Sequence, residues 1–90
     1  NQVDLAISQA QLALQMNKNQ YNNILINLAR HQRLYKKNMV SKYELETMEL
    51  AAKNLKDMVE IAQKQLQQAK AKKQEVLNQY SYLKIKAPND

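Results

Sequence analysis

The side chains that could recognise a partner lie near the middle of this 90-residue chain. Arg30 carries a guanidinium that donates hydrogen bonds, Ser41 carries a hydroxyl, and Glu46 carries a carboxylate. Leu34 adds an apolar side chain among them. Taken singly, Arg30 is typical of a cation beside a helix end, Leu34 of a residue that closes a turn, and Ser41 of a helix cap. Their joint spacing therefore decides whether they form a site.

Catalytic and metal chemistry is not indicated. The chain has no Cys, and its one His, His31, has no second ligand at a spacing suited to a metal. It also has no Gly, the residue that most catalytic loops and phosphate-binding turns require. We predict no metal, no cofactor and no enzymatic activity.

Two apolar stripes with heptad spacing predict the elements that carry these residues. The first stripe is Ile7, Ala10, Leu14, Asn17, Tyr21, Ile24, Leu28, His31 and Tyr35. The second stripe is Leu45, Met48, Ala52, Leu55, Val59, Ala62, Leu66, Ala69, Lys73, Val76, Tyr80 and Leu83. Folding the chain near residue 40 matches the stripes over nine rungs, such as Tyr21 with Val59, and Val3 with Val76 adds a tenth. The paired residue numbers always sum to 79 or 80. The sequence predicts an all-α fold, a two-helix antiparallel coiled-coil hairpin over residues 1–82.

The connection between the helices is expected to be short. Ser41-Lys42-Tyr43-Glu44 has the pattern of a capping box, in which Ser41 and Glu44 bond to each other's backbone amide. Upstream, Asn38 can adopt the left-handed conformation that ends a helix. We place the tip of the hairpin near residues 37–41.

Both ends and one face of the hairpin suggest further structure. Residues 82–90 alternate in polarity and contain Ala-Pro, which predicts a short extended segment at the C-terminal end. We expect a piece of a longer protein in which residues 83–90 begin a truncated β domain.

On the first helix, Leu5, Leu12 and Ile26 recur at multiples of seven opposite the stripe, which favours lateral assembly with neighbouring hairpins.

The residues at the tip resemble a known signature. Arg30, Leu34 and Ser41 are similar to the Arg-x3-Leu-x6-Ser motif at the hairpin tip of periplasmic adaptor proteins, the membrane fusion proteins of tripartite efflux pumps and type I secretion systems. The tail, residues 82–90, is similar to the segment that leads from the hairpin to the lipoyl domain in this family. Many adaptors have Asp five residues after the Ser, where this chain has Glu46. The sequence Arg-x-Gln-Arg-Leu at residues 30–34 is most similar to that of the macrolide-type adaptors, which serve an ABC transporter.

This resemblance implies a function. Such an adaptor is periplasmic and anchored at the inner membrane of a Gram-negative bacterium, forms a ring, usually a hexamer, and links an inner-membrane transporter to a TolC-type outer-membrane channel. Arg30, Leu34, Ser41 and Glu46 would then contact the helical end of the channel.

Two other functions remain open on the sequence. The net charge is +6, and a basic distal half of the second helix could make the hairpin a nucleic-acid-binding arm, resembling the coiled coil with which some tRNA synthetases grip tRNA. The cations of that half are Lys64, Lys70, Lys72, Lys73, Lys84 and Lys86. Because Glu60, Glu75 and many glutamines dilute this stripe, we expect a solvated face and no nucleic-acid partner. A purely structural spacer is the third alternative.

Overall fold

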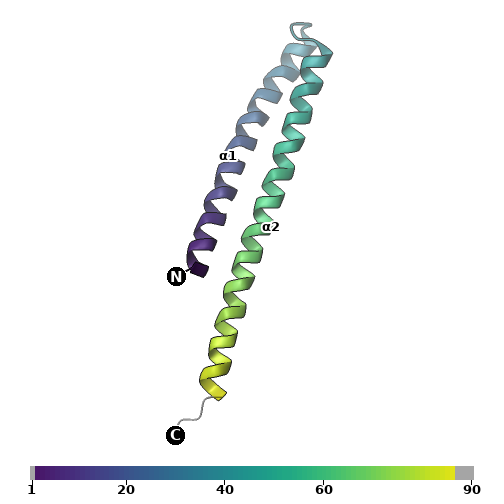
Figure 1. Cartoon of the computed structure of the whole chain (residues 1–90). Coiled ribbons are helices and arrows are strands. Elements are labelled where there is room, and N and C mark those ends of the chain that lie inside the picture. The colour runs from purple at the N-terminus through teal and green to yellow at the C-terminus, as the bar shows by residue number, and fades with distance from the viewer. Residues whose placement is uncertain (1, 87–90) are drawn as a thin grey trace.

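The protein is a single helical hairpin in the computed structural model, which describes residues 2–86 and the side chains of residues 2–83. Helix α1 spans Gln2–Lys36 and helix α2 spans Lys42–Lys86. The helices pack against each other in opposite directions and form a rod of 81 × 15 × 14 Å (Figure 1). The predicted two-helix antiparallel hairpin is thereby confirmed.

The core is the narrow seam between the helices. Leu14 of α1 packs with Ala62 and Leu66 of α2, and Ala62 is only 3% exposed. Ile7, Ala10 and Val59 pack on this cluster and are partly buried. The cluster joins Leu14 to Leu66, one of the predicted rungs. In a hairpin of two helices, each helix covers only a narrow stripe of the other, and the sides of that stripe stay open to solvent. Most other seam residues are therefore half-buried.

The polar residues of the seam are satisfied in different ways. The amide Nδ2 of Asn17 donates to the carbonyl of Ala13 in its own helix at 3.0 Å. Lys73 instead crosses to α1, where its Nζ lies 2.8 Å from Oδ1 of Asp4. The sequence placed Asn17 and Lys73 in the two stripes as polar members, but it did not predict that Lys73 would join the two helices.

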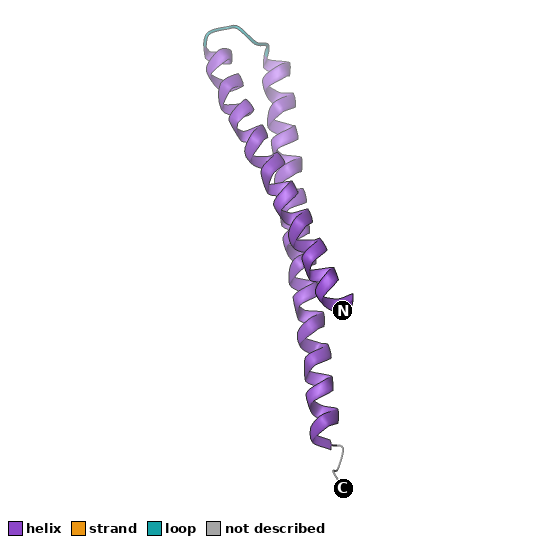
Figure 2. Cartoon of the chain, turned by 90° about the vertical axis from the view of Figure 1, so that its left-hand side faces the viewer, coloured by secondary structure: helices purple, strands orange, loops and turns teal. Residues whose placement is uncertain are grey.

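Helix α2 extends past the N-terminal end of α1 (Figure 2). The last predicted seam residues, Tyr80 and Leu83, are therefore exposed along this extension. Val76, at the level of the N-terminal end of α1, is 38% exposed. Tyr35, at the other end of the stripe, is also exposed because it lies in the last turn of α1. Neither described helix contains an apolar stretch long enough to cross a membrane.

The extended segment predicted from residue 82 is wrong for residues 82–86, because α2 continues through Lys86. The described part of the chain contains no strand with which this segment could pair, and a helix satisfies its backbone groups locally. Leu and Lys are also good helix formers, and the one Pro comes only at position 88. The remainder of the segment, residues 87–90, lies outside the described residues. That the chain continues from this segment into a lipoyl-type β domain stays a prediction.

Candidate functional site at the hairpin tip

Helix α1 ends in a left-handed turn. Asn38 has a φ of 59°, the only positive φ among the described residues. The amide of Met39 donates to the carbonyl of Leu34 at 2.8 Å, and the amide of Asn38 donates to the carbonyl of Tyr35 at 2.9 Å. These two bonds are the Schellman pattern, which satisfies carbonyls left without partners at a helix end. The predicted role of Asn38 is confirmed.

Helix α2 begins with the predicted capping box. The amide of Glu44 donates to Oγ of Ser41 at 3.0 Å, while the amide of Ser41 donates to Oε1 of Glu44 at 3.4 Å. The carbonyl of Ser41 accepts from the amide of Leu45 at 3.1 Å, the first bond of the helix. Val40 and Leu45 are both half-buried, at the two positions of a hydrophobic staple.

Two caps thus define a tip of five residues, 37–41, without any Gly. Backbone bonds tie its first half to α1, and the capping box ties its last residue to α2. The tip is therefore a defined platform for the neighbouring side chains rather than a long mobile loop.

The capping box limits what Ser41 can offer to a partner. Its hydroxyl accepts from the Glu44 amide and also lies 3.3 Å from Oε1 of Glu44, to which it can donate. Its single proton and one of its lone pairs are used within the tip. Ser41 contributes to the surface mainly as a small, exposed residue in a fixed position.

Arg30 and Leu34 lie on one face of α1, because they are four residues apart in a helix. Arg30 is exposed, whereas Leu34 is half-buried and its carbonyl holds the end of the helix. Leu34 therefore has a structural role in the turn while keeping part of its side chain accessible. Neither residue belongs to the heptad stripe of α1.

Glu46 is exposed on the second turn of α2. The fold brings all four predicted docking residues to one end of the rod. No hydrogen bond or ion pair between described side chains joins any two of these four to each other. The four residues therefore share one end of the rod without forming an internally bonded cluster.

A shallow groove of about 300 Å³ lies beside this surface, between the two helices. Its lining includes His31, Tyr43 and Met48 but none of the four docking residues. Nδ1 of His31 lies 2.9 Å from the carbonyl of Asn27. Because a carbonyl only accepts, Nδ1 is the donor in this contact. Across the described residues, no group of three potential ligands is arranged to hold a metal ion.

Sequence reasoning missed two exposed apolar residues at the tip. Met39 is 67% exposed and Tyr43 is 77% exposed. The available signal for Tyr43 was its position opposite the second stripe, with Leu50 seven residues later on the same face. Met39 had no periodic signal because it lies between the helices.

The outer face of α1 carries exposed apolar side chains at the positions that the sequence indicated. Leu5, Leu12 and Ile26 are each more than half exposed, and Met16 adds to the same face. Between residues 5 and 29, Lys18 is the single charged residue. Depletion of charge is typical of the core of a protein interface, so this face is suited to a lateral neighbour.

The opposite end of the rod carries an ion pair and a broad open groove. Lys73 donates to Asp4, and this hydrogen bond and positive charge lower the pKa of the Asp4 carboxyl.

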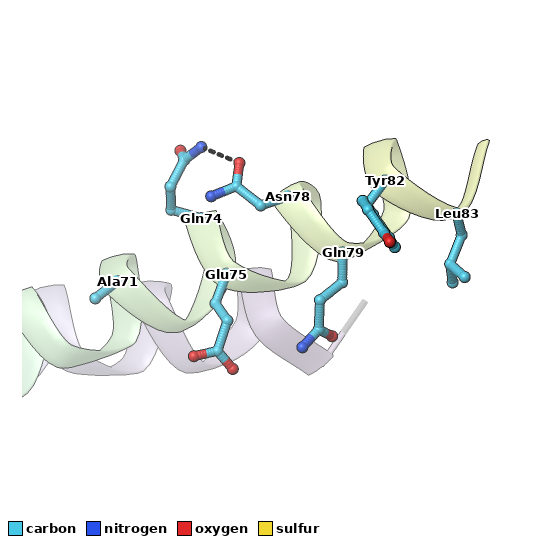
Figure 3. A pocket seen from close by; sticks show the side chains of 7 residues that line it. All are labelled: Ala71, Gln74, Glu75, Asn78, Gln79, Tyr82 and Leu83. Carbon is cyan, nitrogen blue, oxygen red and sulfur yellow. Dashed lines mark hydrogen bonds between the residues drawn. The ribbon is translucent and has the colours of Figure 1, made fainter. Parts of the chain in front are cut away.

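The groove, of about 820 Å³, follows α2 and is lined by the residues labelled in Figure 3. Gln74 donates to Asn78 within it, at 3.1 Å. All its lining residues belong to one helix, so it is an open surface rather than an enclosing site.

The tip therefore gathers the predicted docking residues, both helix caps and two exposed apolar side chains in one small region. Hydrogen bonding, charge and apolar contact are the chemistry that this arrangement offers. Comparisons of the chain with protein-family models, with curated proteins and with solved structures give no match.

Proposed function

We propose that this chain is the α-hairpin of a periplasmic adaptor and that it docks by its tip on the helical end of a TolC-type outer-membrane channel. The observation that carries the proposal is the doubly capped tip. It holds Ser41 at the start of α2 and the turn at Leu34 at the end of α1, with Arg30 exposed one turn away. These are the positions of the adaptor signature that the sequence resembles.

Docking in this proposal is helix-on-helix packing at the tip. The accessible part of Leu34 inserts between helices of the channel, and Arg30 donates to carboxylate or carbonyl oxygens beside it. Ser41 permits close approach because it is small, and its hydroxyl is already engaged by Glu44. Glu46, exposed on the adjoining turn, accepts hydrogen bonds at the edge of the contact.

The lateral face fits the same function. In the full-length protein, the outer face of α1 with Leu5, Leu12 and Ile26 would lie against the next hairpin of a ring, which we propose to be a hexamer. Domains outside this chain would bind an inner-membrane transporter, for which a macrolide-type ABC exporter is our proposal. The location would be the periplasm of a Gram-negative bacterium, with the full-length protein anchored at the inner membrane.

The nucleic-acid arm is less well supported by the contacts. Lys73 is engaged by Asp4, and Nζ of Lys72 lies 3.9 Å from Oε1 of Glu75. Two of the cations that would contact phosphates thus have carboxylates beside them. A purely structural spacer would not require the exposed Met39 and Tyr43 at the tip.

The direct test is binding of the purified chain to a TolC-type channel in detergent. We expect the wild-type chain to bind and Leu34→Asp to lose at least about tenfold in affinity, because a charge is costly in a contact that excludes water. Gln63→Asp, an exposed change in the middle of the rod, is the matched control and should bind like the wild type. Circular dichroism must show equal helicity for both variants. No binding by the wild-type chain, or equal binding by Leu34→Asp, would overturn the proposal.

A further inference from the structure

The end of the rod around the tip, residues 30–42, is strongly basic. Five cations lie within residues 30–42, namely Arg30, Arg33, Lys36, Lys37 and Lys42. All five are exposed. No ion pair within the described residues involves any of them. Their charges are therefore directed to solvent or to a partner.

Helix stability accounts for some of these cations but not for all. Arg33 and Lys36 lie in the last turn of α1, where positive charge complements the helix dipole. Lys42 is the first residue of α2, where a positive charge opposes the dipole. The nearest carboxylate in sequence, that of Glu44, is directed to Ser41 by the capping box. Lys42 thus stands at a position that local stability disfavours, without a compensating ion pair.

Exposed apolar side chains share this end of the rod. Met39 lies between Lys37 and Lys42 in the connection, and Tyr43 follows Lys42 directly. Each leaves more than two thirds of its surface exposed. Met is adaptable, and Tyr supplies a large contact area with a polar end, so both suit an apolar recess on a partner.

We propose that the surface that receives the tip is an acidic protein surface, with an apolar recess for Met39 and Tyr43 bordered by carboxylates that face Lys37 and Lys42. This inference rests on the proposed docking function and adds the chemistry of the partner. Charge complementarity of this kind accelerates association and weakens as salt screens it. An anionic lipid membrane is the alternative binding partner for the tip, and a separate vesicle experiment tests it.

The sharpest variant is Lys42→Glu, because stability and docking respond in opposite directions. A carboxylate at the first residue of α2 complements the helix dipole, so the thermal midpoint should stay equal or rise. Affinity for a TolC-type channel in detergent should fall about tenfold or more at roughly 50 mM salt, mainly through slower association. The difference from the wild type should shrink at roughly 500 mM salt, where the Debye length is only a few Å.

Lys56→Glu is the matched control, since it makes the same charge change at an exposed position in the middle of α2. Its affinity should stay within about twofold of the wild type. Salt-independent docking that is also insensitive to Lys42→Glu would overturn the acidic partner while leaving the docking function intact. Absence of wild-type docking at every salt concentration would overturn both.

The membrane alternative is tested with vesicles of phosphatidylcholine and phosphatidylglycerol, compared with vesicles of phosphatidylcholine alone. We expect no binding of the wild-type chain to either at roughly 150 mM salt, where screening weakens the attraction of a few charges. Binding that requires phosphatidylglycerol and is lost in Lys42→Glu, without docking on the channel, would replace the acidic protein by a membrane surface.

Discussion

Ser41 and Glu44 bond reciprocally at the start of α2, each accepting from the other's backbone amide, at 3.0 Å to Oγ of Ser41 and 3.4 Å to Oε1 of Glu44. The same serine belongs to the proposed docking surface. Stability of the tip and recognition by the tip are thus joined in one residue, and experiments must separate them.

Ser41→Ala should lower the free energy of unfolding by roughly 0.5 to 2 kcal/mol, because the Glu44 amide loses its acceptor. Thermal or denaturant unfolding followed by circular dichroism measures this change. Ser8→Ala, on the exposed side of α1, is the control and should not destabilise the hairpin. An unchanged unfolding midpoint for Ser41→Ala would show that the cap does not stabilise the tip.

The register of the seam predicts a specific crosslink. Tyr21 and Val59 are both half-buried at facing positions, so Tyr21→Cys with Val59→Cys should form a disulfide within one chain under mild oxidation. Tyr21→Cys with Ala52→Cys or with Leu66→Cys should not, because a heptad displaces the partner by about 10 Å along the axis. Non-reducing electrophoresis and mass spectrometry distinguish these products. Preferential linkage of a displaced pair would contradict the register.

Arg30 tests the geometry of the docking contact. Arg30→Ala should weaken binding to a TolC-type channel by roughly 1 to 3 kcal/mol, and Arg30→Lys should restore only part of it, because a guanidinium offers several donors in a planar fork. In cells that carry the proposed full-length adaptor, resistance to the compounds that it would help to export should follow the same order. Full rescue by Lys would show that charge alone matters at this position.

The ion pair between Asp4 and Lys73 predicts a pH dependence of stability. The pKa of Asp4 is lowered in the folded state by the Lys73 hydrogen bond and charge, relative to an ordinary value of 3.8. The unfolded chain therefore binds the proton more tightly, so this contribution to stability is present above pH 3.8 and is lost as pH falls through the folded-state pKa. The carboxylate is exposed, so we expect a small effect.

Asp4→Asn isolates that contribution. Its thermal midpoint should lie below that of the wild type near neutral pH, and the two midpoints should converge at the most acidic pH. Glu49→Gln, an exposed carboxylate on α2, is the control for the general loss of one negative charge. A difference between wild type and Asp4→Asn that persists unchanged at low pH would contradict this assignment.

The apolar outer face of α1 should promote association between hairpins. Leu12→Ser with Ile26→Ser should reduce concentration-dependent self-association, measured by analytical ultracentrifugation, because it removes exposed apolar area from a face that has little charge. Gln63→Ser with Gln65→Ser changes two exposed polar residues of α2 and should have no such effect. Equal association of both double variants would exclude this face as the interface.

Much of the hairpin could be predicted from the sequence because its determinants are local or periodic. A heptad stripe such as that through Leu14 selects one face of a helix, and two matching stripes define an antiparallel register. The cap at Ser41 and the left-handed turn at Asn38 depend on residues within a few positions of each other. The spacing of Arg30 from Leu34 likewise places both on one helix face.

The tertiary structure decided what depends on contacts between elements or on which of two local conformations prevails. Residues 82–86 alternate in polarity and also continue a heptad stripe at Leu83, and the helix prevailed because its hydrogen bonds need no second strand. The Asp4 to Lys73 pair required the distance between two helices. The half-burial of Leu34 appeared only once both helix ends were placed around the turn, because residue type alone does not show how much of a side chain the fold covers.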